Sequence, residues 1–183
     1  MLTPLLIVLG IVLVWLIFLY NRLVTLRFRA REALSDIDVQ LKRRFDLIPN
    51  LVETVKGYMA HEKTVLENIT QARAAVAGAS GTAVDRANVE DGLSGALKTL
   101  FAVAENYPDL KANTNFLELQ REIADTENKI QASRRFYNTT IRDLNTAVST
   151  FPSNMLASSF GFHEEKFFET EAAEEKAPVK VSF

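Results

Sequence analysis

The N-terminal end of the chain places the strongest constraint on its fold. Residues 2–20 read "LTPLLIVLGIVLVWLIFLY", a run of 19 residues without a charge. As an α-helix this run is about 28 Å long, close to the thickness of the hydrocarbon core of a bilayer. Trp15 and Tyr20 lie towards one end of it, where such rings favour the lipid headgroups. The run therefore predicts a transmembrane anchor over residues 1–21.

The residues around the run predict how the anchor is oriented. A secretory signal would need a basic first region and a cleavage site with small residues, and we find neither. No Lys or Arg precedes the run, whereas four arginines follow it closely: Arg22, Arg27, Arg29 and Arg31. Positive charge favours the cytoplasmic side, so we expect a single pass with the N-terminus outside and the rest of the chain in the cytoplasm. The same four arginines are expected to lie near the lipid phosphates.

The composition excludes several kinds of site and partner. The chain has no cysteine, which rules out disulfides, zinc–thiolate centres and cysteine nucleophiles. Five prolines and seven glycines in 183 residues favour long helices over a turn-rich β fold. The net charge of −2 gives no support to nucleic acid as a partner, because neutralising phosphates needs a concentrated basic surface.

The segment after the anchor has a helical apolar pattern that runs through a proline. Residues 22–76 contain one glycine and one proline, Gly57 and Pro49. The apolar positions keep the same helical phase on both sides of the proline: Ile37, Leu41, Phe45, Ile48, Val52, Val55 and Met59. We expect one helix over this range, on the order of 80 Å long and continuous with the anchor. A kink is expected at Pro49, where a hydrogen bond is lost.

Further helices follow, separated by turn residues. The sequence "GASG" at residues 78–81 indicates a loop, and a second helix is expected over residues 82–106. Pro108 suits the first turn of the third helix, and "FPSN" at residues 151–154 indicates where that helix stops. A short final element is expected to end near Gly161, a suitable residue for a helix C-terminus.

The third helix carries the clearest pattern in the chain, a heptad repeat. Its seam consists of Phe116, Leu119, Ile123, Thr126, Ile130, Ser133, Tyr137, Thr140, Leu144, Ala147 and Phe151. Such a seam is typical of helices that pack at a shallow angle. The small polar residues within it favour a bundle with several neighbours over a two-stranded coiled coil.

These patterns predict an all-α fold. An N-terminal transmembrane helix is followed by an elongated antiparallel helical bundle of long rods, with the bundle domain over residues 22–162. Residues 163–183 are predicted to form an acidic, flexible tail, since six glutamates lie between His163 and Lys176. Phe167 and Phe168 are expected to dock on the bundle or on a neighbouring molecule.

Patterns for catalysis and cofactor binding are missing from the sequence. His61 in "HEKTV" and His163 in "HEEKF" both lack the second histidine of a zinc-protease helix. Neither phosphate-binding loop, GxxxxGKS/T or GxGxxG after a strand, is found, and neither histidine belongs to a recognisable nucleophile motif. We therefore expect no enzymatic activity, no metal and no cofactor.

Two sets of polar residues indicate contacts between helices. The first set lies on the first long helix: Asp38, Gln40, Arg43, Arg44, Asp46, Asn50 and Glu53. The second set lies on the third helix: Asn128, Arg134, Arg135, Asn138 and Arg142. If these helices pack antiparallel, some of the groups meet as ion pairs and fix the register of the bundle. The alternative is an interface with another copy or another protein, and the sequence leaves both open.

Four stretches of the sequence resemble the LemA family of bacterial membrane proteins. They are "YNRLVTLR" (20–27), "DIDVQLKRRFDLIPNLVETVKGYMAHE" (36–62), "ENKIQASRRFYNTTIRDLNTAVSTFP" (127–152) and the closing "GF…FFE" (161–169). The resemblance implies a single N-terminal span in the bacterial inner membrane, with the N-terminus outside, and a cytoplasmic antiparallel helical bundle. It implies no established activity or cofactor. The family includes a magnetosome-associated member, and some members sit beside membrane proteases or envelope-stress systems.

The function expected from these features is structural. The anchor, the heptad seam, the charge polarised along the long axis and the missing catalytic motifs favour a non-catalytic scaffold. Such a scaffold binds the lipid bilayer, self-associates as a homo-oligomer through lateral contacts, and organises or shapes the inner membrane. The alternative is an adaptor that presents a bundle face or the acidic tail to a membrane protease or a signalling protein.

Overall fold

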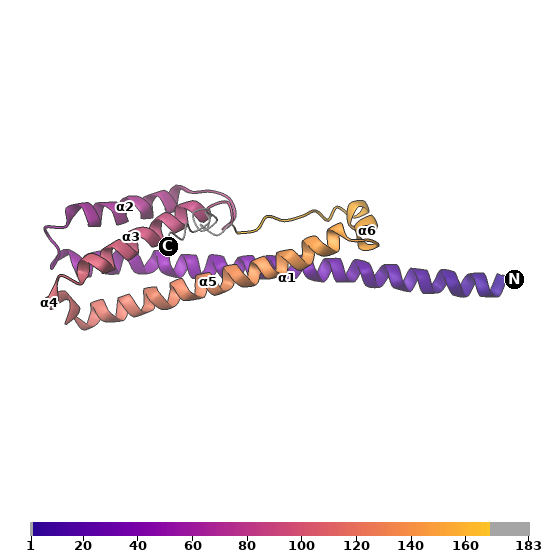
Figure 1. Cartoon of the computed structure of the whole chain (residues 1–183), viewed down its shortest axis with the longest axis horizontal. Helices are drawn as coiled ribbons and strands as arrows, with labels where there is room; N and C mark the ends of the chain where they lie inside the picture. Colours follow the sequence, from indigo (N-terminus) through magenta and orange to yellow (C-terminus); the bar gives the residue numbers. More distant parts are fainter. Residues whose placement is uncertain (1, 169–183) are drawn as a thin grey trace, which may run out of the picture.

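Two long antiparallel helices form the axis of the molecule. The structure is a computed structural model that describes residues 2–168, a range with helices and loops but no strand. The helices are α1 (Leu2–Lys56), α2 (Lys63–Gly78), α3 (Ala87–Ala104), α4 (Pro108–Lys111), α5 (Thr114–Ser149) and α6 (Ser153–Ser159). α1 and α5 share the largest helix–helix contact, and α2 and α3 form a hairpin beside the far half of this pair (Figure 1). The predicted all-α fold with an elongated antiparallel bundle is confirmed.

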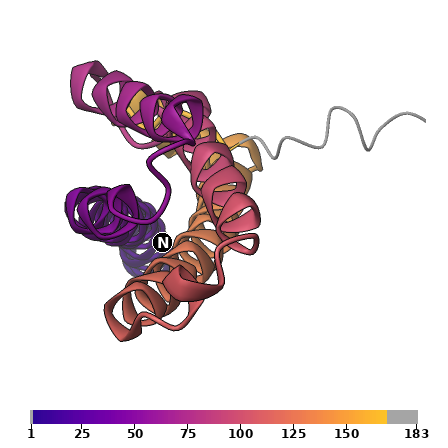
Figure 2. The same ribbon diagram turned by 90° about the vertical axis from the view of Figure 1, so that its left-hand side faces the viewer.

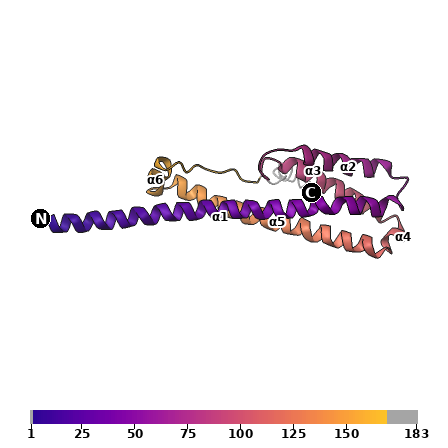
Figure 3. The same cartoon turned by 180° about the vertical axis from the view of Figure 1, so that it is seen from behind.

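The apolar N-terminal run forms the free end of α1. This end extends beyond the rest of the bundle, and the helix continues from it into the bundle without a loop (Figures 1 and 3). Within residues 2–168, α1 is the one helix long and apolar enough, by length and composition, to cross a membrane. Pro49 lies on the exposed side of α1, and the helix continues through it to Lys56.

The first long helix is shorter than its apolar pattern indicated. It ends at Lys56, and residues 57–62 turn the chain into α2. Met59, within this turn, is fully buried, which explains why the apolar phase continues past the end of the helix. The reversal places Ile69 and Val76 in the core that α1, α3 and α5 share, whereas a straight helix would carry both beyond these partners. The prediction that the helix continues to Val76 is wrong for this reason.

Local capping explains why other boundaries differ from the predictions. α3 begins at Ala87 rather than at Thr82, because Thr82 first forms a turn with Asp85. The Asp85 carboxylate accepts from the Thr82 hydroxyl at 2.8 Å and from its backbone N–H at 3.0 Å, and these bonds lower the pKa of Asp85. Asn113 caps α5 by accepting a backbone N–H at 3.0 Å. This cap separates α5 from the short α4. Pro108 therefore begins α4, and the helix with the heptad seam begins at Thr114 rather than at Pro108 as predicted.

Three apolar cores follow one another along the α1–α5 pair. The far core lies among α1, α2, α3 and α5, which are arranged around it in the end-on view (Figure 2). The middle core joins α1 residues 30–41 to α5 residues 130–144. The core next to the apolar N-terminal run consists of Leu23, Ala147, Ala157 and Phe162. The bundle is therefore held together in layers along its length rather than by one central core.

Most of the predicted seam of α5 faces these cores. Eight of its eleven residues are buried: Phe116, Ile123, Thr126, Ile130, Tyr137, Thr140, Leu144 and Ala147. Leu119 and Ser133 are half-buried. Phe151 is exposed, because α5 has already ended at Ser149 and the chain is turning into α6. The seam prediction is confirmed along the helix and is wrong at Phe151.

The short final helix ends as predicted near Gly161. This glycine has a φ of 68°, a left-handed conformation that favours a residue without a Cβ. The Phe162 N–H then donates to the Ala157 carbonyl at 2.9 Å, which closes the end of α6 and turns the chain back along α5.

The first residues of the predicted tail run back along α5. Residues 163–168, here called the strap, are held by two asparagine side chains. Asn138 donates to the Phe168 carbonyl at 3.0 Å and accepts from the Phe168 N–H at 2.8 Å. Asn145 makes the equivalent pair of hydrogen bonds with the Glu165 backbone, both at 2.9 Å. Each asparagine thus satisfies one backbone N–H and one C=O of an otherwise unpaired segment.

The last described residue of the strap is buried against the bundle. The Phe168 ring lies edge-on to Tyr137, with 5.2 Å between ring centroids, whereas Phe167 stays exposed. Burial, with the negative charges of Glu165 and Asp85, raises the pKa of the Tyr137 hydroxyl to about 12. Of the predicted docking residues, Phe168 therefore docks on the bundle of its own chain. The flexible tail stays a prediction, since residues 169–183 lie outside the described residues.

The substitution Asn138→Ala tests how the strap is held. It removes both hydrogen bonds to Phe168, each of which contributes about 1 kcal/mol. We expect the amides of the strap to exchange hydrogen roughly tenfold faster in the full-length protein, as measured by hydrogen–deuterium exchange mass spectrometry. Asn128→Ala is the matched control, because Asn128 is an exposed asparagine on the same helix. Equal exchange in the two variants would show that Asn138 does not hold the strap.

Candidate functional site

A layer of charged side chains separates the far core from the middle core. On α1, Arg44 occupies the buried position between Leu41 and Ile48 and is 0 % exposed. Helical geometry places it there, since it follows one core residue by three positions and precedes the next by four. Glu127 of α5 lies at the same height, and α3 contributes the buried Glu90. The layer therefore joins three helices at one level of the bundle.

The Arg44 guanidinium bonds to both of the other helices. Its Nη2 donates to the Glu90 carboxylate at 2.5 Å and to the Glu90 backbone carbonyl at 3.1 Å. Its Nη1 donates to the Glu127 carboxylate at 2.6 Å and to the Ser94 hydroxyl. Ser94 also lies 3.1 Å from the second carboxylate oxygen of Glu127. A guanidinium suits this position because its N–H groups point outwards in fixed directions and reach several acceptors at once.

Two further ion pairs flank this centre. Arg86, just before α3, bonds Asp38 of α1 at 2.8 Å and reaches the second oxygen of Glu90 at 3.4 Å. Arg134 of α5 bonds Asp91 of α3 at 2.6 Å. With Arg44 and Glu127, three arginines and four carboxylates cross-link α1, α3 and α5.

Burying such a network is unfavourable unless every charge stays paired. Taking an ion out of water costs several kcal/mol, and the attraction within a pair compensates for this only when the geometry is good. Compared with apolar side chains of the same size, the network therefore contributes little net stability. Any other register of the helices, however, would leave Arg44 buried without a carboxylate. The main physical effect of the network is to fix the register of α1, α3 and α5.

The sequence indicated that Arg44 is a polar residue between helices, but it did not predict that Arg44 is fully buried. The apolar pattern passes through Phe45, yet Phe45 is half-buried and Arg44 takes the core position. Glu90 and Ser94 were missed. For Glu90 a signal exists, because it lies three residues before Leu93 and therefore on the inner face of α3.

The other predicted polar residues differ in where they lie. Asp38 and Arg134 join helices, Asn138 holds the strap, and Gln40 is half-buried. The remaining seven are exposed: Arg43, Asp46, Asn50, Glu53, Asn128, Arg135 and Arg142. The structure thus divides the predicted set into residues that fix the bundle and residues that are available to a partner.

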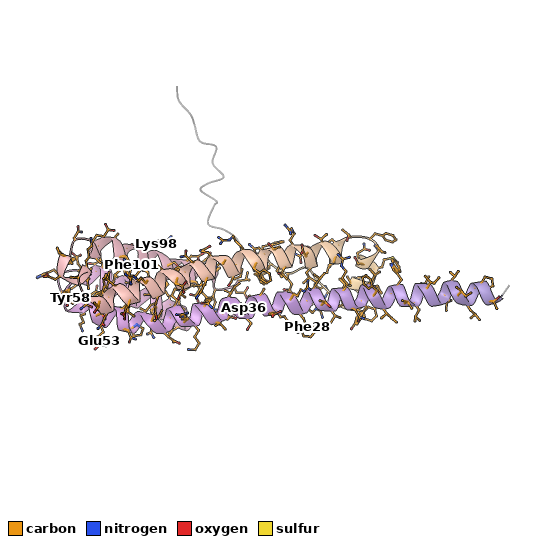
Figure 4. All side chains as sticks on the ribbon, turned by 90° about the horizontal axis from the view of Figure 1, so that it is seen from below. Phe28, Asp36, Glu53, Tyr58, Lys98 and Phe101 are labelled. Atoms are coloured by element: carbon orange, nitrogen blue, oxygen red, sulfur yellow. The ribbon has the colours of Figure 1, made fainter. Side chains whose placement is uncertain are left out.

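The exposed sides of α1 and α5 carry opposite charge. The outer face of α1 consists of Phe28, Glu32, Ser35, Asp36 and Val39, and Figure 4 labels Phe28 on the outer side of this helix. The outer face of α5 consists of Arg135, Phe136, Thr139, Arg142 and Asp143, and Arg142 pairs with Asp143 at 3.3 Å. On α1 the stretch from Glu32 to Asp36 is acidic and lies between exposed basic residues, with Arg29 and Arg31 before it and Lys42 and Arg43 after it. The α5 face carries the basic Arg135 and Arg142, and each face has exposed apolar side chains.

These two outer faces lie at the same height along the bundle. Leu23 packs with Ala147 at one end of the α1–α5 pair, and Arg44 bonds Glu127 further along. Because the helices are antiparallel, α1 residues in the thirties lie level with α5 residues in the upper 130s. The inner sides of α1 and α5 face each other across the buried middle core. The two outer faces therefore point in opposite directions, away from this core.

Of the four arginines after the anchor, Arg27 has a structural contact. It donates to the Gly161 carbonyl at 2.8 Å and its guanidinium lies over the Phe162 ring, 3.9 Å from the centroid. It thereby holds the segment after α6 against α1. The other three arginines are exposed: Arg22, Arg29 and Arg31.

The carboxylates of the charged layer are bound to arginines and to Ser94. They also border two open grooves: Glu127 and Asp91 line one of about 430 Å³ between α3 and α5, and Glu90 and Asp38 line one of about 350 Å³ beside α1. Among residues 2–168 no group of three or more His, Asp or Glu side chains could hold a metal ion. His61, in the turn after α1, and His163, at the start of the strap, are both exposed.

The substitution Arg44→Met tests whether the network depends on its central charge. Methionine fills similar space but leaves the buried Glu90 with only the longer, 3.4 Å contact to Arg86, and breaking a buried pair typically costs about 3–5 kcal/mol. We expect a loss of this size in the free energy of unfolding of the full-length protein in detergent, followed by circular dichroism in urea.

The matched control for this prediction is Arg43→Met, at the neighbouring exposed position, where a change within about 0.5 kcal/mol is expected. Adding Glu90→Gln to Arg44→Met should recover part of the loss, because the buried charge is removed. Equal losses for the two arginine variants would contradict a role for buried charge.

Comparison with known proteins identifies the family of this chain. Residues 33–183 match the LemA family. The chain is similar to the protein LemA of Metamycoplasma hominis, with 31% identity over 160 residues, which covers 84% of this chain and 70% of the relative. It is also similar to the magnetosome protein MamQ of Magnetospirillum gryphiswaldense, with 24% identity over 183 residues, 86% of this chain and 67% of the relative. This chain belongs to the LemA family.

Proposed function

We propose that this protein is a non-catalytic, membrane-anchored scaffold whose copies associate side by side and so organise or shape the bacterial inner membrane. The apolar end of α1 crosses the membrane with the N-terminus outside. The bundle then lies in the cytoplasm, on the side where the four arginines follow the anchor. Its partners are the lipid bilayer and other copies of the same chain.

The complementary charge of the two outer faces carries this proposal. Copies anchored by the same helix in one membrane stand parallel, with equivalent residues at equal heights. In the register that pairs Leu23 with Ala147 and Arg44 with Glu127, Asp36 of one copy comes level with Arg135 of its neighbour. Glu32 lies within about one helical turn of the level of Arg142, so that opposite charges come close. Such complementarity favours this pairing and disfavours contacts between two identical faces.

Apolar side chains on the same faces add area to the contact. Phe28 and Val39 are exposed on the α1 face, and Phe136 is exposed on the α5 face. Ion pairs between exposed groups contribute little by themselves. Burying the apolar side chains between them supplies the main free energy of association, while the charges select the orientation.

The contact joins one face to a different face of the next copy. Contacts of this kind repeat in one direction and generate rows, or rings if the rotation closes. Because α1 runs from the membrane span into the bundle as one helix, a row of bundles also fixes the spacing of the anchors. A row of evenly spaced anchors is a direct means of organising a membrane.

Reversing the charges on each face tests this contact. The variants E32R/D36R and R135E/R142E each place like charges opposite one another. We expect each to reduce the mass of assemblies of the full-length protein in mild detergent severalfold, measured by light scattering after size-exclusion chromatography. The combined variant E32R/D36R/R135E/R142E restores opposite charges and should restore assembly.

Two controls complete this test. The variant K63E/K98E reverses two exposed charges on α2 and α3, away from both faces, and should assemble like the unaltered protein. Deleting residues 169–183 distinguishes the scaffold from the adaptor alternative, in which the tail binds a membrane protease or a signalling protein. A scaffold keeps assembling without these residues, whereas an adaptor that works through them loses its partner. A monomeric protein under all conditions would contradict the proposal.

A further inference from the structure

The segment that joins α5 to the strap carries no charge. Residues 144–162 contain no Asp, Glu, Lys or Arg, and this is the longest uncharged stretch after the N-terminal apolar run. Residues 150–162, here called the corner, contain α6 and the turns on either side of it. The corner combines small polar residues with the large apolar side chains of Phe151, Met155, Phe160 and Phe162.

The corner lies beside the end of the membrane anchor (Figure 3). The Phe160 ring is 5.0 Å from the ring of Tyr20, centroid to centroid, and Phe162 packs with Leu23 just after the span. Arg27 holds Phe162 in this place. The corner is therefore fixed at the level where α1 leaves the hydrocarbon.

Three apolar side chains of the corner are largely exposed. Phe151 is 78 % exposed, Met155 is 64 % exposed and Phe160 is 56 % exposed. Ala157 and Phe162, by contrast, are buried against α1. The corner therefore has one apolar side that covers α1 and a second apolar side that the described residues leave open. Exposed apolar groups that gather in this way mark a site of interaction.

A basic groove adjoins the corner. This open groove, of about 590 Å³, lies between α1 and the end of α5, and its lining includes Phe18, Arg22, Arg29, Asp143, Thr150 and Ser153. Thr150 and Ser153 of the corner line the same groove as Phe18, which belongs to the N-terminal apolar run. The start of the corner therefore lies level with the end of that run. Guanidinium groups beside apolar side chains at this height suit a membrane interface, where the former meet phosphates and the latter meet acyl chains.

We propose that the corner enters the headgroup layer of the leaflet from which α1 emerges, with Phe151, Met155 and Phe160 in contact with lipid. The protein then has two membrane contacts, the span and the corner. A single helix leaves the bundle free to rotate about the axis of the span. A second contact beside that axis fixes the rotation, and with it the direction in which the two outer faces point.

Position favours lipid over a protein as the occupant of this surface. The covalent link to the span keeps the corner at the bilayer surface at a high effective concentration. Its neighbours on α1, such as Phe18, are themselves exposed side chains of the apolar run that needs lipid around it. This proposal does not depend on self-association, because it concerns a single copy and the bilayer.

Site-specific labelling of the full-length protein tests the proposal, and the absence of native cysteines makes each introduced cysteine unique. Phe151→Cys and Met155→Cys carry an environment-sensitive fluorophore in vesicles of phosphatidylethanolamine and phosphatidylglycerol. Lys98→Cys is the control, since Lys98 is exposed on α3 away from both outer faces and borders the same groove as Glu127 of α5, about 35 Å further from the membrane than Phe151. We expect blue-shifted emission and severalfold stronger quenching by nitroxide-labelled lipids at the two corner positions than at the control.

Two results would overturn the proposal. Water-like, unquenched emission at all three positions would place the corner outside the membrane. Blue-shifted emission that nitroxide lipids fail to quench would show that protein covers the corner instead. The measurement is then repeated with the E32R/D36R substitutions and at less than one copy per vesicle. Copies cannot associate under these conditions, so any lipid contact that remains belongs to the single protein. Lipid quenching that persists there supports the corner even if the protein does not assemble.

Discussion

The buried guanidinium of Arg44 is the constraint on which the rest of the structure depends. Its bonds to Glu90 and Glu127 are satisfied in one relative position of α1, α3 and α5, because a shift of any helix leaves a charge buried without a partner. The apolar cores on either side are chains of similar aliphatic residues, which by themselves tolerate more than one register. The charged layer removes that freedom.

The fixed register determines where the two candidate surfaces lie relative to the membrane. A slip of α5 along α1 by one heptad would move it by about 10 Å. The basic face with Arg135 would then no longer be level with the acidic face around Glu32. The corner would also leave the end of the span, where Tyr20 and Phe160 meet. A buried ion network far from the bilayer therefore determines both the lateral contact and the membrane contact that we propose.

The sequence predicted the periodic parts of this fold, and the unpredicted parts depend on tertiary contacts. The uncharged run of residues 2–20 identified the apolar end of α1, and strong periodicity identified the α5 seam. The turn at residues 57–62 escaped prediction because Met59 keeps the apolar phase while packing into the core from a turn rather than a helix. The full burial of Arg44 escaped prediction because an arginine is normally expected at the surface of a helix. Only the positions of Glu90 on α3 and Glu127 on α5, which pair with it, show that it can be buried. The order of the strap depends on Asn138, whose partner lies 30 residues away.

The scaffold account is tested most directly by electron cryo-microscopy of the unaltered full-length protein in its native membrane. The account predicts rows of elongated bundles that stand at one height above the bilayer, with the outer face of α1 in each copy against the outer face of α5 in the next. Single, separated bundles at the density the protein reaches in its native membrane would contradict it.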